Sequence, residues 1–315
     1  MTQGRAARAS AVFLAALLCG CGGEGAGPSR QFLSIGTAGT GGIYYPLGGA
    51  LASLLSVGDS LRQFTAEVTG GSVENVNRVR EGQIDLGFAL SLSAYEAFNG
   101  GTDYPEAFED LRVVAPLYPN VVHVLVPRGS DASSLGDLAG GRVSVGAAGS
   151  GTEQVARQIL EAYGLTYDDV DARFLTFSES AASLRDGAID AAIISVGYPA
   201  AAVLEATTTG GARLLPMESD RTAALRERYP YYSQGVIPAG AYPGVLAEIP
   251  TVAMMNWVVS RADLDEEVVV NLLNIIRDQR AVLEQVHEMA GQIDLATLRG
   301  APIPLHGATL AWLGM

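Results

Sequence analysis

The sequence predicts an α/β protein of two similar lobes, with two parallel-type sheets joined by two crossover hinge strands. Short apolar runs alternate with segments of helical periodicity, a pattern typical of parallel strands covered by helices on both faces. The order of these segments occurs twice, each time ending on a Gly-x-Ile-Asp sequence, at residues 82–85 and 187–190. The chain has 315 residues and is 48% hydrophobic, enough for two cores.

The first residues indicate export and lipid anchoring. Arg5 and Arg8 precede the apolar run 9–18, which is too short to span a bilayer and is typical of a signal peptide. The run ends on Leu-Cys-Gly-Cys, which matches the bacterial lipobox and predicts a lipoprotein signal peptide over 1–20 with lipidation at Cys21. Residues 21–31 are predicted to be a flexible tether, because they are rich in glycine. We expect an extracytoplasmic, periplasmic protein anchored by lipid to a membrane.

A glycine loop follows the first predicted strand, residues 32–35, and leads into a helix whose first turn contains Pro46. A helix that begins in this way directs unpaired N–H groups and a partial positive charge at whatever lies above it, so the loop predicts an anion site. The dinucleotide fingerprint does not fit, because the glycines do not fall as G-x-G-x-x-G. The candidate ligand-binding residues here are Thr37, Gly39, Thr40, Gly41, Tyr44 and Tyr45.

The rest of the first repeat comprises a strand over 64–68 and a helix over 73–81 with Ser72 as its predicted N-cap. Thr69, Ser72 and Asn75 can either cap this helix or contact a ligand, and they remain candidates, as does Ser91. Asp85, at the Gly-x-Ile-Asp joint, is interpreted as a turn-capping residue.

The second repeat has the same order. A strand over 142–145 leads through a second glycine loop, 146–152, into a helix; a strand over 173–177 and a helix through 184 capped by Ser178 follow, with Asp190 at the joint. This loop predicts a second anion site that faces the first, and Tyr198 supplies a rigid wall with a polar tip. The candidates here are Gly149, Ser150, Gly151, Thr152, Tyr198 and Pro199.

Two further apolar segments predict the crossing strands. Residues 113–126 have a proline-interrupted middle, and residues 252–259 form the return crossing, after which helices are predicted over 266–276 and 280–289. Lobe 1 is therefore expected to comprise 32–118 and to be completed by 250–315, with lobe 2 at 119–249.

Composition excludes several classes of function. Every basic residue is arginine, which excludes a Schiff-base lysine and a P-loop lysine, and the net charge of −14 makes nucleic acid a poor partner. After cleavage one cysteine remains, at the lipidation site, and the histidines at 123, 287 and 306 are too scattered for metal-ligand spacing. Ser150 does not form G-x-S-x-G, because residue 148 is alanine. We therefore expect no catalysis, cofactor or metal.

Five segments resemble the TAXI family, the solute receptors of TRAP (tripartite ATP-independent periplasmic) transporters. They are TAGTGGIYYPLG at 37–48, TGGSVEN at 69–75, GSGTE at 149–153, GYP at 197–199 and PLHGA at 304–308. The resemblance implies a two-lobed periplasmic binding protein of type II, a ligand such as glutamate or another small dicarboxylate, and delivery to a sodium-driven TRAP permease. The chain departs from the family at Leu90 and Leu92, where relatives usually have Gln and Asp.

We expect a monomer whose lobes close on a small acid, held by backbone donors and by hydroxyls such as Thr40 and Thr152. Without acidic partners at Leu90 and Leu92, a four- or five-carbon dicarboxylate or a 2-oxo acid is favoured over an amino acid. The alternatives are a binding protein of an ABC importer with the same fold, a ligand-sensing partner of a membrane histidine kinase, and a periplasmic enzyme.

The lipobox leads to a direct prediction. The wild-type protein should incorporate a fatty-acid probe and fractionate with membranes, whereas Cys21→Ala should lose the label, because lipid is attached through that thiol. Metabolic labelling followed by membrane fractionation measures both properties. Label that persists on Cys21→Ala would exclude this anchor.

Overall fold

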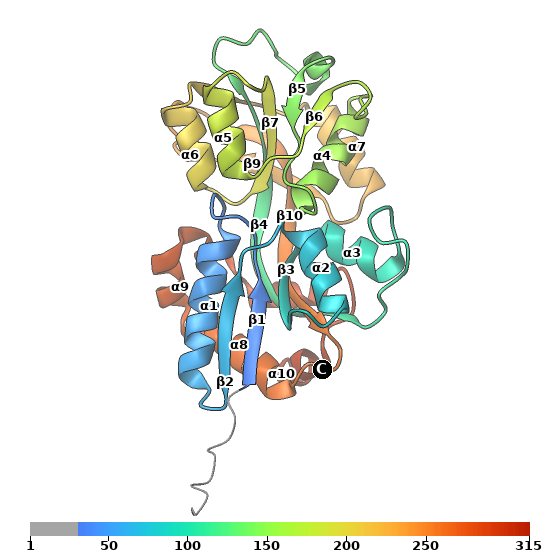
Figure 1. The fold of residues 1–315 in the computed structure, drawn as a ribbon, viewed down its shortest axis with the longest axis vertical. Helices are drawn as coiled ribbons and strands as arrows, with labels where there is room; N and C mark the ends of the chain where they lie inside the picture. The colour runs from blue at the N-terminus through green and yellow to red at the C-terminus, as the bar shows by residue number, and fades with distance from the viewer. Residues whose placement is uncertain (1–30) are drawn as a thin grey trace, which may run out of the picture.

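The computed structural model describes residues 31–315, so the signal peptide, Cys21 and all but the last residue of the tether lie outside the described residues. The described chain forms two lobes stacked along the longest axis of the molecule, and two long strands run through both (Figure 1). This architecture confirms the predicted α/β fold with two crossing strands.

The strands form one mixed sheet of ten strands rather than two separate sheets. The order is β2-β1-β3-β10-β4-β7-β5-β6, with β8 beside β4 and β9 beside β10. Within each lobe the neighbouring strands of the repeat are parallel: β1 pairs with β2 and β3, and β5 pairs with β6 and β7. The strands are β1 (Gln31–Gly36), β2 (Arg62–Glu67), β3 (Leu86–Leu90), β4 (Leu111–Pro127), β5 (Arg142–Ser144), β6 (Asp171–Arg173), β7 (Ala191–Val196), β8 (Ala212–Leu215), β9 (Ser233–Ile237) and β10 (Ile249–Arg261).

The two crossing strands, β4 and β10, make the sheet continuous because they pair with each other antiparallel from Leu111↔Arg261 to Val121↔Ala253. Their register shifts between Met255 and Trp257, opposite the segment of β4 that contains Pro116 and Pro119. Proline cannot donate a hydrogen bond to the ladder, so an irregularity is expected at this point. The shift lies midway between the lobes.

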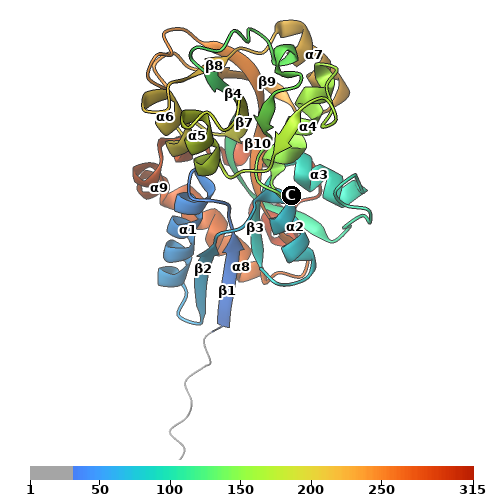
Figure 2. The same cartoon turned by 45° about the horizontal axis from the view of Figure 1, so that its top comes forward.

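Helices cover both faces of each half of the sheet (Figure 2). The lower lobe carries α1 (Tyr44–Gly58), α2 (Ser72–Arg80), α3 (Ser91–Asn99), α8 (Glu266–Asp278), α9 (Arg280–Val286), α10 (Gly307–Trp312) and the short 3₁₀ segments η2 (Glu288–Gln292) and η3 (Leu295–Gly300). The upper lobe carries η1 (Leu135–Leu138), α4 (Gly151–Ala162), α5 (Phe177–Arg185), α6 (Ala201–Thr208) and α7 (Ser219–Arg228). In both views α5 and α6 lie above α1, and α4 lies above α2 and α3.

Four local predictions were wrong, and three of them concern α2, β6 and the start of α5. Helix α2 has Gly71 as its N-cap, at φ +122°, and Ser72 lies in the first turn, where its hydroxyl accepts from the Leu90 N–H at 3.1 Å. Strand β6 ends at Arg173, and α5 begins at Phe177 with Thr176, not Ser178, as its cap. The Thr176 hydroxyl accepts from the Glu179 N–H, and the Glu179 carboxylate accepts from the Thr176 N–H, a reciprocal pair that fixes the start of the helix.

The last long helix was also predicted three residues too long. α9 ends at Val286, because His287 leaves the helical region at φ −160° and its Nδ1 accepts from the Met289 N–H. The apolar spacing that suggested one helix to residue 289 therefore continues into the separate 3₁₀ turn η2.

The two Gly-x-Ile-Asp joints have matching hydrogen bonds. The Asp85 carboxylate accepts from the Ser34 N–H at 2.8 Å while the Asp85 N–H donates to the Ser34 carbonyl. Asp190 does the same with Arg142, at 2.8 Å for both bonds. Each aspartate thus hydrogen-bonds the turn before the last strand of its repeat to the first strand, as a turn-capping residue does.

Among residues 31–315, none of the helices combines the length and the apolar character that a bilayer span requires.

Asp190 also forms an ion pair with the Arg142 guanidinium at 2.7 Å, and these contacts lower the pKa of Asp190 from 3.8 to about 2. Because the pKa of Asp190 is lower in the folded chain than in the unfolded chain, the ionised carboxylate stabilises the fold. This stabilisation is complete above the unfolded pKa of 3.8 and is lost as the pH falls from 3.8 through about 2. Because the pair is half exposed, Asp190→Asn should lower the free energy of unfolding by only about 1 kcal/mol at pH 7, and by less at pH 3. Urea denaturation at both pH values checks this, and an equal loss at both would contradict the linkage.

Candidate functional site

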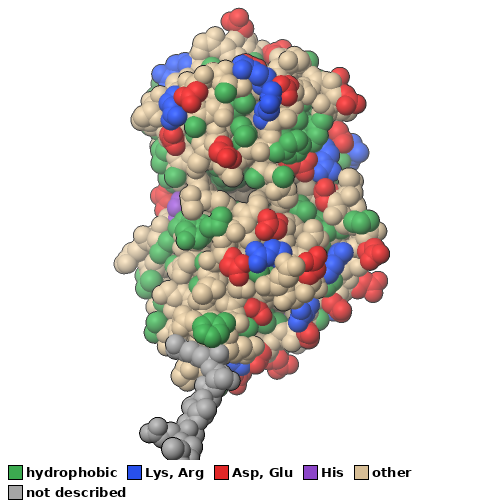
Figure 3. Space-filling model, viewed as in Figure 1, with side chains coloured by type: hydrophobic (Ala, Val, Ile, Leu, Met, Phe, Trp, Pro, Cys, Tyr) green, Lys and Arg blue, Asp and Glu red, His purple; other side chains and the backbone are tan. Residues whose placement is uncertain are grey.

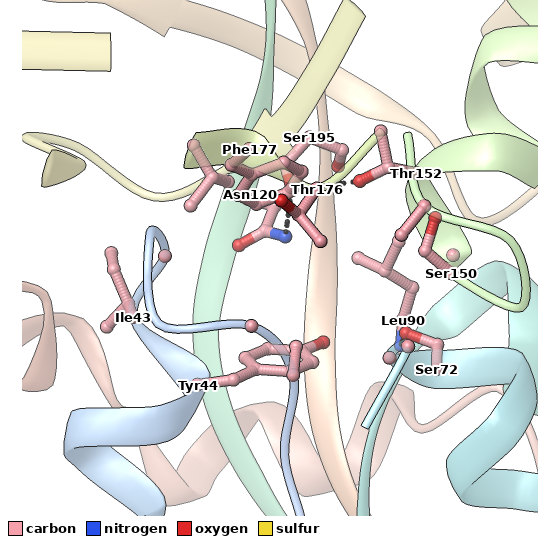
Figure 4. A pocket seen from close by; sticks show the side chains of 18 of the residues that line it. Ile43, Tyr44, Ser72, Leu90, Asn120, Ser150, Thr152, Thr176, Phe177 and Ser195 are labelled. Atoms are coloured by element: carbon pink, nitrogen blue, oxygen red, sulfur yellow. Dashed lines mark hydrogen bonds between the residues drawn. The ribbon is translucent and has the colours of Figure 1, made fainter. Parts of the chain in front are cut away.

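A cavity lies between the lobes, where the two halves of the repeat face each other (Figure 4). The volume open to the centre of a water-sized molecule is about 60 Å³, enough for several waters or one small solute. The surface is hollowed at the same level (Figure 3). The lining residues are Ala38, Gly39, Gly42, Ile43, Tyr44, Thr69, Gly70, Gly71, Ser72, Leu90, Tyr118, Asn120, Ala147, Ser150, Gly151, Thr152, Thr176, Phe177, Ser195 and Val196.

Four helices begin at this cavity, two from each lobe. The lining includes the first residues or the caps of α1, α2, α4 and α5, represented by Tyr44, Ser72, Gly151 and Phe177. The first N–H groups of a helix have no partner within the helix, and its N-terminus carries a partial positive charge. Neither α1 nor α2 has a side-chain cap, so their N–H groups are not satisfied by a cap residue. Hydroxyls cap α4 and α5 through the Glu153 and Glu179 N–H groups, so we expect the free backbone donors to come chiefly from the uncapped starts of α1 and α2.

No Arg, His, Asp or Glu side chain is among the residues that line the cavity. The polar groups are hydroxyls and one amide, and the walls between them are apolar, formed by Ile43, Leu90, Phe177 and Val196. Burial raises the pKa of Tyr44 and of Tyr118, so both phenols stay neutral. The lining therefore offers a ligand no charged side chain, and its electrostatic contribution is limited to the partial positive charges of the helix N-termini.

Ser195 has a buried hydroxyl with no hydrogen-bond partner in the described chain. The residue is 3% exposed, its Oγ makes no hydrogen bond, and it belongs to the cavity lining on β7. A buried polar group without a partner costs about 1–3 kcal/mol. Such a hydroxyl is expected to be satisfied by whatever occupies the cavity.

A chain of buried hydrogen bonds runs beneath the cavity from one lobe to the other. The Tyr44 hydroxyl donates to Asn256 Oδ1, Asn256 Nδ2 donates to Asn120 Oδ1 at 2.8 Å, and Asn120 Nδ2 donates to the Ser195 carbonyl at 3.0 Å. The chain thus links α1 to β10, β4 and β7, at the level where the crossing strands change register. We call these four residues the hinge relay.

Seven predicted ligand-binding residues line the cavity: Gly39, Tyr44, Thr69, Ser72, Ser150, Gly151 and Thr152. They come from both glycine loops and from the start of α2, so the structure brings the two predicted anion sites together. Ser150 is in addition the N-cap of α4, where its hydroxyl accepts from the Glu153 N–H at 3.1 Å.

Four other predicted residues of the lower lobe do not line the cavity. Thr37 is fully buried, and its hydroxyl donates to the Glu67 carbonyl at 2.6 Å. The Asn75 amide donates to the Thr37 and Phe88 carbonyls at 2.7 and 2.9 Å and so ties the glycine loop to β3. Thr40 and Tyr45 are exposed, because the loop and the first turn of α1 direct them away from the cleft.

The other five predicted residues also lie outside the lining, and most of them contact neighbouring elements. The Ser91 hydroxyl accepts from the Trp257 indole N–H at 2.7 Å. The Gly149 carbonyl accepts from the Glu74 N–H of the other lobe, and the Gly41 carbonyl accepts from Ala202. The Pro199 carbonyl lies 3.0 Å from His287 Nε2, and the bond between Tyr198 and Pro199 is cis.

Sequence reasoning missed several lining residues, among them Asn120, Thr176, Phe177 and Ser195. Thr176 and Phe177 were assigned to a strand, although Thr176 and Glu179 carry the capping-box spacing that marks a helix start. Asn120 is a polar residue within an apolar crossing strand, which was a usable signal. Ser195 follows four apolar residues of β7, and nothing in its spacing sets it apart.

The histidines serve structural roles. His123 is fully buried and contacts the Tyr242 hydroxyl at 2.9 Å through Nε2, and burial lowers its pKa to about 4. His306 caps α10 through the Ala308 N–H at 3.2 Å, and burial lowers its pKa as well. Within residues 31–315, no group of three or more His, Cys, Asp or Glu side chains could hold a metal ion.

Comparison with known proteins gives a family and a fold. The model of the NMT1-like family matches residues 35–313, and the chain therefore belongs to this family. The fold is similar to that of an ancestral arginine-binding protein bound to arginine, with TM-score 0.50, 17% identity, and 82% of this chain and 97% of that one covered. It is equally similar, at TM-score 0.50, to the ligand-binding component of an ABC-type import system from Staphylococcus aureus, with 11% identity and coverage of 87% and 84%.

A third solved structure, the alkanesulfonate-binding protein SsuA from Xanthomonas axonopodis pv. citri bound to MOPS, has TM-score 0.49 and 18% identity, with 87% of this chain and 84% of that one covered. The likeness to the arginine-binding protein confirms the predicted type II periplasmic binding-protein fold.

Gly151 offers a test of how closely the lobes approach at the site. A Cβ at this position would lie 2.6 Å from Leu90 Cδ1 and 2.7 Å from Ser72 Oγ, both in the opposite lobe. Overpacking of this kind costs about 1–3 kcal/mol, so Gly151→Ala should hold the lobes apart. Small-angle scattering should show a larger radius of gyration for this variant.

Gly49→Ala is the matched control, because no atom lies within 4 Å of its Cβ position in α1. It should leave the scattering profile unchanged. A Gly151→Ala profile identical to wild type would contradict the close approach of the two lobes.

Proposed function

We propose that this member of the NMT1-like family is an extracytoplasmic solute-binding receptor that closes its two lobes on a small organic acid and carries out no covalent chemistry. The observation that carries the proposal is the convergence of four helix N-termini on a cavity whose lining has no charged side chain. Such a site favours an anion without any counter-charge from the protein.

The energetics of the site support an anionic ligand. Each helix N-terminus stabilises a negative charge by about 0.3–1 kcal/mol, and by up to about 2 kcal/mol when partly buried. Two helices begin on each side of the cavity, so carboxylates at the two ends of one molecule can each take several N–H bonds. The negative net charge of the chain matters little at contact distance, because surface charge is screened within about 8 Å at physiological salt.

The same lining disfavours an amino acid or a cation. An ammonium group needs an acceptor, preferably a carboxylate, and no Asp or Glu lines the cavity. Leu90, which departs from the family pattern, lines the cavity and makes that wall apolar, whereas Leu92, in α3, is fully buried and does not line it. We therefore favour a four- or five-carbon dicarboxylate or a 2-oxo acid over a glutamate-like ligand.

The transporter served by the receptor is a separate question. The solved structures named above include the ligand-binding component of an ABC-type import system, which supports an ABC importer. The motif at 37–48 favours a TRAP permease instead. A gene for an ATPase beside this one would support the ABC importer. A gene for a large permease would support the TRAP system, and a gene for a histidine kinase would support a sensing role. In each case we propose a lipid-anchored monomer in the periplasm.

Isothermal calorimetry tests the class of ligand. Succinate or 2-oxoglutarate should bind more tightly than a neutral sugar or a diamine, because only an anion interacts favourably with all four helix ends. Tight binding of the sugar or the diamine, with no binding of the acids, would overturn the proposal.

Two hydroxyls of the lining test how the ligand is held. Ser195→Ala and Thr152→Val should each weaken binding of the acid about tenfold or more, because a hydrogen bond to a charged group is worth about 1.5–3 kcal/mol. Thr40→Val is the matched control, since Thr40 is exposed and lies outside the lining. Full affinity in both lining variants would show that the acid binds elsewhere.

A further inference from the structure

A second set of contacts joins the lobes outside the cavity, between α3 with its following loop in the lower lobe and α4 in the upper lobe. None of the residues that form it lines the cavity. Its members are Ser93, Glu96 and Asp103 below, and Glu153, Gln154, Arg157 and Gln158 above. We call these seven residues the α3–α4 bridge.

The contacts of the bridge are numerous and polar. Arg157 Nη2 lies 3.1 and 3.2 Å from the two Asp103 carboxylate oxygens, and Gln154 Nε2 donates to the same carboxylate at 2.9 Å. Gln154 Nε2 also donates to Glu96 at 3.2 Å, and the Ser93 hydroxyl donates to Gln154 Oε1 at 2.5 Å. The side chains of Arg157 and Asp103 are 27% and 22% exposed, so water screens this ion pair less than it screens an exposed one.

The bridge is continuous with the site through α4. The first two residues of that helix, Gly151 and Thr152, line the cavity, and Gln154 and Arg157 lie within the next two turns. A helix moves as a rigid element, so contacts that fix Gln154 and Arg157 against the lower lobe also fix the helix N-terminus over the cavity.

We infer that the α3–α4 bridge is a latch that holds the two lobes closed even when the cavity is empty, with Asp103, Gln154 and Arg157 as positioning residues. The inference rests on the proposed function. A receptor whose closed state is already populated binds its solute more tightly, because apparent affinity scales with the populated fraction of the competent state. Affinity would thus be set partly by residues that never touch the solute.

Because of the charges around it, substitution of Arg157 should weaken the latch more than substitution of any other member. Glu96, Asp103 and Glu153 surround it, and Arg157 also pairs with Glu153 at 2.6 Å. Burial and then the neighbouring Asp103 charge raise the pKa of Glu96, which shows how crowded these carboxylates are. Without Arg157, uncompensated carboxylates of the two lobes repel each other across the interface.

Amide hydrogen exchange on the purified, extensively dialysed protein tests the latch, because the Glu74 N–H donates across the cleft to Gly149 and the Ala202 N–H to Gly41. In Asp103→Asn, exchange at both amides should be about tenfold faster than in wild type, and the radius of gyration should be larger. Arg157→Met should show the larger effect of the two variants. Arg157→Lys keeps the charge and should restore part of the protection.

Asp190→Asn is the matched control, because it also removes a carboxylate that pairs with an arginine, but within the upper lobe. In this variant the Glu74 and Ala202 amides should exchange hydrogen at the same rate as in the wild-type protein. Unchanged exchange in both latch variants, or equal acceleration in the control, would overturn the latch. Because no solute is added, this experiment can contradict the latch without contradicting the proposed ligand class. The ligand class is tested separately by calorimetry.

Discussion

The antiparallel ladder between β4 and β10 is the constraint on which the rest of the structure depends. Because these strands pair from one lobe into the other, they place two α/β repeats on a single sheet and set the distance between them. The ladder is irregular midway, opposite the prolines of β4, and the hinge relay from Tyr44 to Ser195 crosses it there. An irregular ladder midway between the lobes suits a hinge.

The position of the cavity follows from the same constraint. In parallel α/β units the helix that follows each strand begins at the strand's carboxyl end, and ligands bind beyond those ends. Two such units facing each other across the crossing strands bring α1 and α2 opposite α4 and α5. A site made in this way can hold an anion through backbone N–H groups and hydroxyls without a charged side chain, which agrees with a chain that has no lysine and a cavity lining that has no arginine. The α3–α4 bridge joins the lobes at a second place, outside the cavity lining.

Much of this arrangement could be predicted from sequence, because it depends on local signals. The apolar runs and glycine loops located both repeats, and the Gly-x-Ile-Asp joints marked equivalent positions that share the same hydrogen bonds. What could not be predicted depends on contacts between distant segments. Thr37 and Asn75 belong to motifs that suggest ligand binding, yet they bind backbone carbonyls of their own lobe. Asn120 and Ser195 come together at the cavity because β4 pairs with β7 from Val121 onward, at the end of the upper lobe that faces the lower one.

The central claim is that backbone dipoles, and not charged side chains, select a small organic anion. The most direct measurement is mass spectrometry of the solute released on denaturation from natively purified protein, with exact mass and fragmentation identifying the solute and hence its charge at neutral pH. We predict a four- or five-carbon acid that is negatively charged at neutral pH, at close to one molecule per chain. A cationic or neutral solute at the same occupancy would contradict the claim.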